Sequence, residues 1–490
     1  MPSTALHIQL QKWAKEYGPI FSVMLGCKTM IVLTSPHAVK ELLDKRSGIY
    51  SSRPELYIAQ ICTGHNNIGL MPYGARWRMF RKLTHTNLNI NAAKSYVPYQ
   101  NLENKQMLSD MLDRPELFIQ HLRRYTSSLT TQMLFGVRTC AMDDPFITQL
   151  FEDTRKLSVI IRSSAAAFLD IFPALRVLPD FLLPQRRYAK SLYYENRSHL
   201  GDIWSKVKTA TENGTAKPCI SMEFLRDQQI SGYSDEAAAF MVGTLLEGGT
   251  DTTSNTLVGF VQAMVLFPEV QKKAQEDIDR ICGDRLPTME DEPNLQYVRA
   301  CIKEVLRWMP TAILGVPHAA IEDDEYMGYK IPKGADIVCN IWGIHMDENV
   351  YPNPRTFDPT RYEHDFQTAF EATCNPDVSK RDHFGFGAGR RICPGMHVAE
   401  RSLYIGISRL LWGFNIEKAL DENGNEIVPD SNKIKDGLLA MPEPFPAKIT
   451  PRSERHAQII REEWHKCQGL LDQDMQWNEV PADMVCNKNM

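Results

Sequence analysis

Cys393 lies in a short segment whose composition suits a reactive or metal-binding thiolate. Residues 384–395 read FGFGAGRRICPG, and the three alternating glycines let the backbone turn tightly and approach a ligand closely. Pro394 is typical of the first turn of a helix, which places the sulfur at a helix N-terminus. The helix dipole and the neighbouring Arg390 and Arg391 favour the charged thiolate. A thiolate at such a place binds a metal or attacks an electrophile.

Two other interpretations of this segment have to be weighed from its residues alone. A single cysteine is most often a small, buried core residue. A run of glycines also occurs in dinucleotide-binding loops, which follow a buried strand. Residues 380–383 read KRDH, however, and make a poor strand. The segment therefore favours a thiolate site over a dinucleotide site.

The same segment resembles the signature F-x-x-G-x-R-x-C-x-G of the haem-thiolate monooxygenases, the cytochrome P450 family. The matching residues are Phe386, Gly389, Arg391, Cys393 and Gly395. The resemblance implies haem b as the cofactor, with Cys393 as the axial metal ligand, Phe386 shielding the sulfur and Arg391 bonded to a haem propionate. Gly389 belongs to the same cofactor-binding loop. In such a site the thiolate donates electron density to iron and favours cleavage of the O–O bond.

A second motif lies inside a long, largely apolar run, residues 237–267, that we expect to form one buried helix. Residues 247–253 read EGGTDTT, in which two glycines weaken the helix and a threonine can bond back to the preceding turn. Alone, this pattern indicates either a kink between packed helices or a local opening for a small ligand. It matches the family pattern A/G-G-x-D/E-T-T, and the resemblance implies that Asp251 and Thr252 are catalytic and relay protons to dioxygen.

A third set of residues gives only weak evidence by itself, and its order along the chain strengthens that evidence. Glu304 and Arg307 form an E-x-x-R pair, and the same spacing occurs elsewhere without any sign of a role. In the family this pair precedes a segment like residues 357–362, FDPTRY, whose arginine joins the pair behind the cysteine loop. The resemblance implies a structural network of Glu304, Arg307 and Arg361, with Tyr362 standing where phenylalanine is commoner. A buried network of this kind fails when one member is removed.

The remaining expectations about the site also follow from the resemblance. Trp77 and Arg81 match a W-x-x-x-R helix, and His318 follows a proline at a position that reaches haem. These three residues and Arg391 are therefore expected to surround the haem propionates. We also expect apolar segments to cover the substrate. They are the start of the long helix and the segments around 57–71, 160–181, 311–316 and 437–440. They predict a hydrophobic small-molecule substrate.

The elements that must hold these residues are mainly helical. Helical periodicity dominates from about residue 70 to 310, and we expect a final helix over 394–413. β-rich runs near the N-terminus and around 325–342 predict a small β region formed from both ends of the chain. The fold class is mainly α with a small β region, and the resemblance implies the cytochrome P450 fold with haem buried between two long helices. We expect one domain over residues 1–450 and a C-terminal extension over 451–490 on the surface.

Composition argues against several other classes of protein. The 490 residues include 55 Lys and Arg against 60 Asp and Glu, a net charge of −5, which argues against nucleic-acid binding. The 11 cysteines are scattered without a C-x-x-C pair, which argues against zinc sites and disulfide frameworks and favours a reducing compartment. No run of apolar residues is long enough to span a membrane.

We therefore predict a haem-dependent monooxygenase that inserts one oxygen atom of O₂ into a hydrophobic small molecule, with electrons from NADPH–cytochrome P450 reductase. The sequences of residues 340–347 and of the segment that begins at Arg390, RRICPGMHVAERSL, are similar to those of filamentous-fungal microsomal members such as O-methylsterigmatocystin oxidoreductase-like enzymes. That similarity indicates secondary metabolite biosynthesis. The alternatives are a xenobiotic or aromatic-compound hydroxylase, a haem-thiolate isomerase or coupling enzyme, and a non-catalytic haem sensor.

The resemblance also implies a location. Family members of the microsomal type lie on the cytosolic face of the endoplasmic reticulum membrane, held by an N-terminal helix. We expect that anchor to be absent from this chain, which leaves peripheral contact or a soluble form. Residues 168–184, FLDIFPALRVLPDFLLP, carry many large apolar side chains that suit either a bilayer surface or a lid over the substrate.

Overall fold

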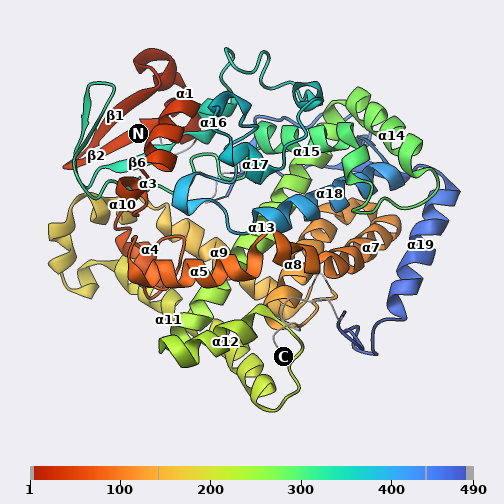
Figure 1. Cartoon of the computed structure of the whole chain (residues 1–490), viewed down its shortest axis with the longest axis horizontal. Helices are drawn as coiled ribbons and strands as arrows, with labels where there is room; N and C mark the ends of the chain where they lie inside the picture. The colour runs from red at the N-terminus through yellow and green to blue at the C-terminus, as the bar shows by residue number, and fades with distance from the viewer. Residues whose placement is uncertain (1–4, 142, 436–438, 482–490) are drawn as a thin grey trace.

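The computed structural model describes residues 5–141, 143–435 and 439–481, which form a mainly helical fold (Figure 1). The strands are short, and the largest sheet lies beside the N-terminal helix. The expectation of a mainly α fold with a small β region is confirmed.

The helices range from single turns to the 32 residues of α13. The longer helices are α1 (Leu6–Tyr17), α5 (Ala75–Leu88), α7 (Val97–Asp113), α8 (Phe118–Phe135), α9 (Pro145–Ile161), α10 (Ser164–Ile171), α11 (Pro184–Glu212), α12 (Ile220–Ser231), α13 (Asp235–Leu266), α14 (Pro268–Cys282), α15 (Gln296–Trp308), α18 (Met396–Gly413) and α19 (Glu454–Gln468). The short helices are α2 (Pro36–Val39), α3 (Ser47–Tyr50), α4 (Tyr57–Cys62), α6 (Ile90–Ser95), α16 (Ile341–His345) and α17 (Ala369–Cys374).

The largest sheet joins distant parts of the chain. Its order is β1 (Ile20–Leu25), β2 (Lys28–Leu33), β6 (Asp336–Cys339) and β3 (His318–Ala319). The β1–β2 pair is an antiparallel hairpin, and β2 runs parallel to β6 with Met30 opposite Asp336. This pairing confirms that the β-rich run near the N-terminus and the run around 325–342 build one β region. Two-stranded sheets are formed by β4 (Asp324–Tyr326) with β5 (Tyr329–Ile331), β7 (Phe414–Lys418) with β10 (Ala447–Pro451), and β8 (Ile434–Lys435) with β9 (Met441–Pro442).

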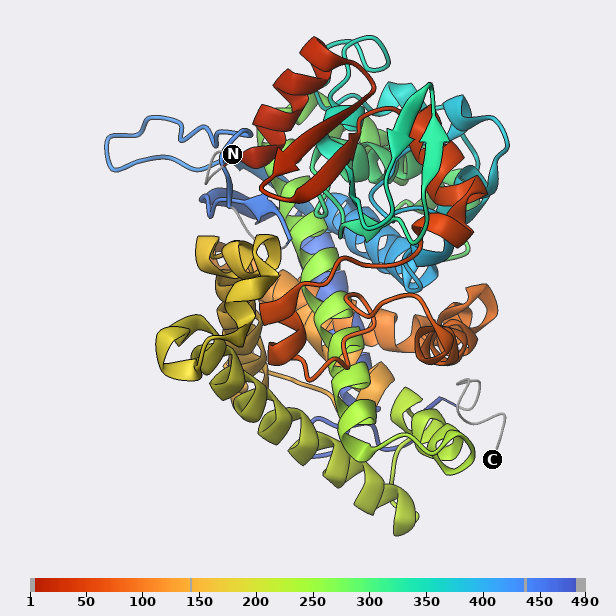
Figure 2. The ribbon, with the colours of Figure 1, turned by 90° about the vertical axis from the view of Figure 1, so that its left-hand side faces the viewer.

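Helix α13 runs through the centre of the molecule and carries the second motif (Figure 2). Ser234 caps its N-terminus, where the Ala237 N–H donates a hydrogen bond to the serine hydroxyl at 3.1 Å. Every residue in 257–265 is buried, and the apolar ones contact a core built with α7, α8, α14, α15 and α18. Because neighbours surround it on all sides, the helix needs no polar face, which explains its long apolar sequence.

Helix α18 begins two residues later than the sequence suggests. The sequence predicts Pro394 as the first residue, whereas the helix begins at Met396 with Gly395 as its N-cap. The reason lies in the loop before it, where the Cys393 N–H donates a hydrogen bond to the Phe386 carbonyl at 2.8 Å. This bond keeps the backbone in a turn until the chain has passed Pro394.

The segment after β10 packs across the helices behind the site. Helix α19 lies beside α7, where Lys105 and Glu463 form an ion pair at 2.6 Å. Residues 469–481 then reach the end of α8. The Trp477 indole N–H donates to Gln132 Oε1 at 2.7 Å, and the Trp477 side chain is only 6% exposed.

Candidate active site

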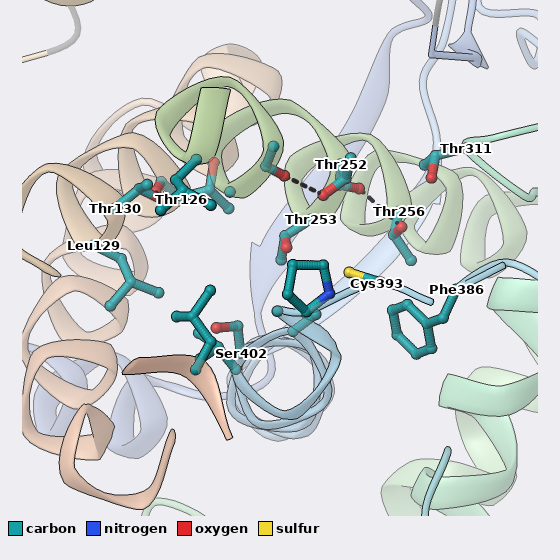
Figure 3. Close-up of a pocket in the computed structure, with 18 of the residues that line it drawn as sticks. Thr126, Leu129, Thr130, Thr252, Thr253, Thr256, Thr311, Phe386, Cys393 and Ser402 are labelled. Carbon is teal, nitrogen blue, oxygen red and sulfur yellow. Dashed lines mark hydrogen bonds between the residues drawn. The ribbon is translucent and has the colours of Figure 1, made fainter. Parts of the chain in front are cut away.

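A cavity of about 330 Å³ lies between α13 and α18, with α8 beside it as a third wall (Figure 3). None of the described residues that line it is charged, and most of its surface is apolar. Leu129 and Met133 contribute from α8, and Thr252 and Thr256 contribute from α13. The cysteine loop closes the cavity beside α18, with Cys393 in the lining.

Two opposing effects act on the pKa of the Cys393 thiol. Burial raises the pKa of the Cys393 thiol, whereas a hydrogen bond from the Gly395 backbone N–H and the positive charge of Arg81 lower it. Metal binding needs the thiolate rather than the thiol. The Gly395 amide and Arg81 therefore favour the form of the side chain that binds iron.

The positive charge beside the sulfur comes from Arg81 on α5 and not, as the sequence suggested, from Arg390 and Arg391. Arg81 donates to the Ile392 carbonyl at 2.6 Å, next to the cysteine. A turn at Gly389–Arg391 directs the other two side chains toward residues 51–73. The expectation that those two arginines charge the thiolate directly is corrected.

Gly389 and Phe386 shape the cysteine loop. Gly389 has a φ of +61°, and a Cβ atom there would lie 1.9 Å from the Leu43 carbonyl oxygen, so a larger residue does not fit. Its N–H donates to Asp44 Oδ1 at 2.6 Å, which ties the loop to the N-terminal part of the fold. The Phe386 ring lines the cavity beside the sulfur (Figure 3).

Half-buried arginines and the buried His318 gather at one edge of the site without acidic partners. Arg391 donates to the Ser51, Ile68 and Met71 carbonyls and stacks on the Trp77 ring at 4.3 Å. Burial and the nearby guanidiniums of Arg53 and Arg81 lower the pKa of Arg391 to about 9. Burial and the charge of Arg53 lower the pKa of His318 to about 3, and its ring bonds the Tyr50 carbonyl at 2.7 Å.

Arg53 is a member of this cluster that the sequence interpretation missed. Its guanidinium donates to the carbonyls of Gly69, Val316 and Pro317, and burial lowers its pKa to about 9. No carboxylate in the described ranges neutralises Arg53, Arg81 or Arg391. Arg53 belongs to no motif, and its partners lie far along the chain, so no sequence pattern marks it.

The residues present fit haem b. Guanidiniums that are partly withdrawn from water without a neutralising partner are costly in a protein unless an anion joins them. Haem b supplies two propionate carboxylates, a flat apolar ring for the slot between α13 and α18, and an iron for the cysteine sulfur. The cation cluster, the apolar lining and the position of Cys393 match these three requirements.

The EGGTDTT motif stays helical. Helix α13 is unbroken through it, so the local opening considered from the sequence is absent from this fully described helix. The Thr252 hydroxyl donates to the Gly248 carbonyl at 2.7 Å, the backward bond that the sequence predicted (Figure 3). Gly249 lies against α8, where a Cβ atom would come within 2.8 Å of the Thr130 side chain. The glycine thus allows α8 and α13 to pass closely.

Asp251 and Thr252 face different surroundings. Thr252 lines the cavity, whereas Asp251 does not. Burial raises the pKa of Asp251, and the charges of Arg123 and Lys435 act against that rise. The Thr252 hydroxyl therefore lies at the cavity and the Asp251 carboxyl lies outside it, although the two residues are adjacent in the chain.

The structure brings Glu304, Arg307 and Arg361 together. Arg307 Nε and Nη2 each donate to a Glu304 carboxylate oxygen at 2.7 Å, and both side chains are fully buried. Arg361 is held less closely, with its Nε 3.6 Å from Glu304 Oε1 and its Nη2 bonded to the Pro352 carbonyl at 2.7 Å. The Asp358 N–H also donates to Glu304 at 2.9 Å.

His345 connects this network to the cysteine loop and was not singled out for any chemistry from the sequence. Its Nδ1–H donates to the Arg307 carbonyl at 3.1 Å, and its Nε2 accepts from the Phe384 N–H at 2.8 Å. Burial, with nearby positive charge, lowers the pKa of His345 well below its usual value, so the ring is neutral. A histidine in an apolar run is most often a core residue, and only the fold shows these two partners.

The segments expected over the substrate are only partly found at the cavity. Ile68 and Gly69 line it, as do Thr311 and Ala312, whereas none of residues 160–181, all described, does so. In 437–440, residues 437 and 438 lie outside the described residues, and the Ala440 N–H donates to the Thr311 carbonyl at 2.7 Å. Helix α8, which the sequence did not indicate, supplies Leu129 and its neighbours instead.

Comparison with known families agrees with this geometry. A sequence model of the family Cytochrome P450 matches residues 2–448. The chain belongs to the cytochrome P450 family.

This cytochrome P450 has close fungal relatives. It is 51% identical over 486 residues to cytochrome P450 monooxygenase virE of Hypocrea virens, covering 99% of this chain and 88% of the relative. It is 49% identical over 488 residues to cytochrome P450 monooxygenase fogE of Aspergillus ruber, covering 99% and 90%. A zebra fish cytochrome P450 solved with progesterone shares the fold, with a TM-score of 0.74 at 22% identity over 92% of this chain and 100% of that one.

These relationships confirm the predicted family, fold and enzyme class, since this cytochrome P450 is a monooxygenase of a fungal type. The family implies a haem-thiolate cofactor, O₂ as a substrate and a redox partner that supplies electrons. Within the part of the chain that the structure describes, no helix has the length and hydropathy needed to cross a bilayer.

Proposed function

We propose that this cytochrome P450 inserts one oxygen atom of O₂ into a neutral, hydrophobic small molecule in fungal secondary metabolism. The second oxygen atom leaves as water after taking up two electrons and two protons. One observation carries the proposal: Thr252 on α13 and Cys393 in the loop before α18 line the same apolar, uncharged cavity (Figure 3). The fungal monooxygenases among its relatives support the biosynthetic setting.

Several residues of this chain would hold haem b. Cys393 would bind the iron, and Arg81, His318 and Arg391 would hold the propionates. Trp77 orients Arg391 by stacking on its guanidinium. The bound haem supplies the iron that activates dioxygen. Phe386 keeps water from the sulfur beside it.

Asp251 and Thr252 have separate roles in proton delivery. The Thr252 hydroxyl donates to the Gly248 carbonyl, so its oxygen is left to accept a hydrogen bond from a proton donor in the cavity. The raised pKa of the Asp251 carboxyl brings its proton exchange closer to neutral pH. The carboxyl then passes protons inward to the hydroxyl side of the helix.

Two surfaces suit the partners. Arg78, Lys82 and Arg390 are exposed and Arg401 is half-buried on the side of the cysteine loop, which suits an acidic patch of NADPH–cytochrome P450 reductase. Elsewhere, Val177 is 85% exposed and Phe181 is 74% exposed. Such a patch suits peripheral contact with the cytosolic face of the endoplasmic reticulum membrane.

The experiment starts from purified holoenzyme and a library of neutral, hydrophobic compounds screened for type I shifts of the haem spectrum. Compounds that shift the spectrum are then incubated with reductase, NADPH and ¹⁸O₂. We expect NADPH-dependent product that carries one ¹⁸O atom. Failure to consume O₂ with every binding compound would favour a haem sensor, and product formed from peroxides without NADPH would favour an isomerase.

A further inference from the structure

One half-buried acidic group on α13, Glu247, has no part in the mechanism above. Glu247 lies one helical turn before Asp251, so the two side chains project from the same face of the helix, with Cβ atoms about 6 Å apart. Among the described residues, Glu247 has no hydrogen bond or ion pair. Thr250 shares this face, and its buried hydroxyl also lacks a partner in the described chain.

Neighbouring elements bring further charged groups to this face. The carboxylates of Asp251 and of Asp153 on α9 both act on the charge of Glu247. Arg123 on α8 and Lys435 on β8 act on Asp251, and the buried Nε of Arg123 has no partner within the described ranges. Buried polar atoms without protein partners are normally bridged by ordered water. The face between α8, α9 and α13 is therefore suited to a short chain of water molecules.

The same cluster reaches the surface through a histidine. His199 on α11 has its Nδ1 2.8 Å from Asp153 Oδ2. The His199 side chain is 38% exposed, whereas the Asp153 side chain is 12% exposed. Titratable groups thus follow one another from solvent at α11, through α9, to the central helix.

Glu247 is set apart from the substrate. Thr244 and Gly248, its neighbours along α13, line the cavity, whereas Glu247 does not. Burial and the two nearby carboxylates raise the pKa of Glu247 to about 7. A carboxyl with that pKa gains and loses protons readily at neutral pH.

We propose that Glu247 returns protons to Asp251 after each transfer, taking them from solvent by way of His199 and Asp153. The proposal rests on the proposed role of Asp251 and Thr252. Protonated Glu247 gives its proton through water to the Asp251 carboxylate and becomes a carboxylate itself. It then regains one proton from the Asp153 side, where the His199 imidazole exchanges protons with water. Each cycle moves one proton inward and leaves every side chain in its starting state.

The test compares Glu247→Gln and Asp153→Asn with the wild type and with Glu400→Gln. Glu400 on α18 is a matched control, since burial raises its pKa to about 7 and its Oε1 accepts the Ala369 N–H at 2.7 Å, outside this cluster. Each holoenzyme, with haem loading checked by its carbon monoxide spectrum, is assayed for NADPH oxidation with reductase from pH 6 to pH 9, in H₂O and in D₂O. Infrared titration follows the carboxyl bands of the same proteins.

We expect Glu247→Gln to slow NADPH oxidation at least about tenfold, to enlarge the D₂O effect and to remove a carboxyl band that titrates near pH 7. Asp153→Asn should slow the reaction in the same direction, and Glu400→Gln should leave the rate unchanged. A wild-type rate and D₂O effect in Glu247→Gln would overturn the inference. If Asp251→Asn is impaired in that case, only the inference fails, and if Asp251→Asn is also normal, the proposed relay fails with it.

Discussion

Thr252 and Asp251 are neighbours in the chain but face different surroundings, because a helix turns each successive side chain by about 100°. The hydroxyl reaches the cavity, and the carboxyl reaches charged groups of other helices. On the proposed function, this separation keeps an acid out of the space that accepts the apolar substrate. Its consequence is that each residue can be tested alone.

Thr252→Ala removes the only part of this side chain that can hold a proton donor in the cavity. We expect normal haem content, slower product formation and a larger share of electrons recovered as hydrogen peroxide. Thr252→Ser, which keeps the hydroxyl, should restore most of the coupling. The measurement is the ratio of peroxide to NADPH consumed, and fully coupled turnover by Thr252→Ala would refute the relay.

Glu247→Gln should also change how stability depends on pH. The folded protein holds this proton with a pKa of about 7, against 4.5 for the free side chain. The folded state therefore binds more protons than the unfolded state between these values, and wild-type stability falls as the pH rises through them. At pH 8 the glutamine variant should be more stable by about 2–3 kcal/mol, with little difference below pH 4.5. Denaturant unfolding measures this, and parallel pH profiles would contradict it.

Among the elements, α15 and α16 clamp the cysteine loop from behind. Glu304 and Arg307 are bonded to each other on α15. His345 at the end of α16 connects this pair to the loop, because it bonds the Arg307 carbonyl and accepts the Phe384 N–H. On this side, the loop that carries Cys393 is thus held by a hydrogen bond that the Phe384 N–H donates to a neutral histidine. Rigidity of this kind keeps the sulfur at one distance from bound iron.

Arg307→Ala and Arg361→Ala should differ in severity. Arg307 is fully buried with two bonds of 2.7 Å to Glu304, so its loss leaves an unpaired buried carboxylate and costs about 3–5 kcal/mol. Arg361 lies 3.6 Å from Glu304 and is 13% exposed, so its loss costs less. We expect haem-poor, poorly folded Arg307→Ala and partly haem-loaded Arg361→Ala. Haem content per chain measures this, and equal loading of both variants at the wild-type level would contradict it.

The sequence predicted the parts of the site that depend on residues close together along the chain. The thiolate loop needs adjacent glycines, arginine and cysteine, and an E-x-x-R pair needs one helical turn, so both can be recognised from spacing. Arg53 and His345 could not be recognised, because their partners at residues 316 and 384 come from other segments. The directions of Arg390 and Arg391 depend on a turn whose geometry only packing against Leu43 fixes.

At the scale of the whole molecule, the last described residues support the wall of the cavity. Gln476 and Met475 bind Arg138, which with Arg124 and Gln132 surrounds the buried carboxylate of Glu103. This network lies behind α8, whose other face lines the cavity. The C-terminal segment thus stabilises a helix that lines the cavity.

Trp477→Ala tests this support. The indole is nearly buried against Tyr99 and bonded to Gln132, so its removal should cost about 3–5 kcal/mol and lower the melting temperature. Trp477→Phe keeps most of the packing and loses one hydrogen bond, which costs about 1 kcal/mol. Thermal unfolding of both variants makes the comparison, and an unchanged melting temperature in Trp477→Ala would show that the segment does not stabilise α8.

The central claim is that the Cys393 thiolate binds haem iron in the cavity between α13 and α18. The most direct measurement is the carbon monoxide difference spectrum of the reduced protein, recorded for the wild type and for Cys393→Ser with equal haem supplied. The wild type should show the long-wavelength band of thiolate-ligated haem, and Cys393→Ser should lose it. A wild-type chain that stays colourless, or a serine variant with an unchanged band, would contradict the account.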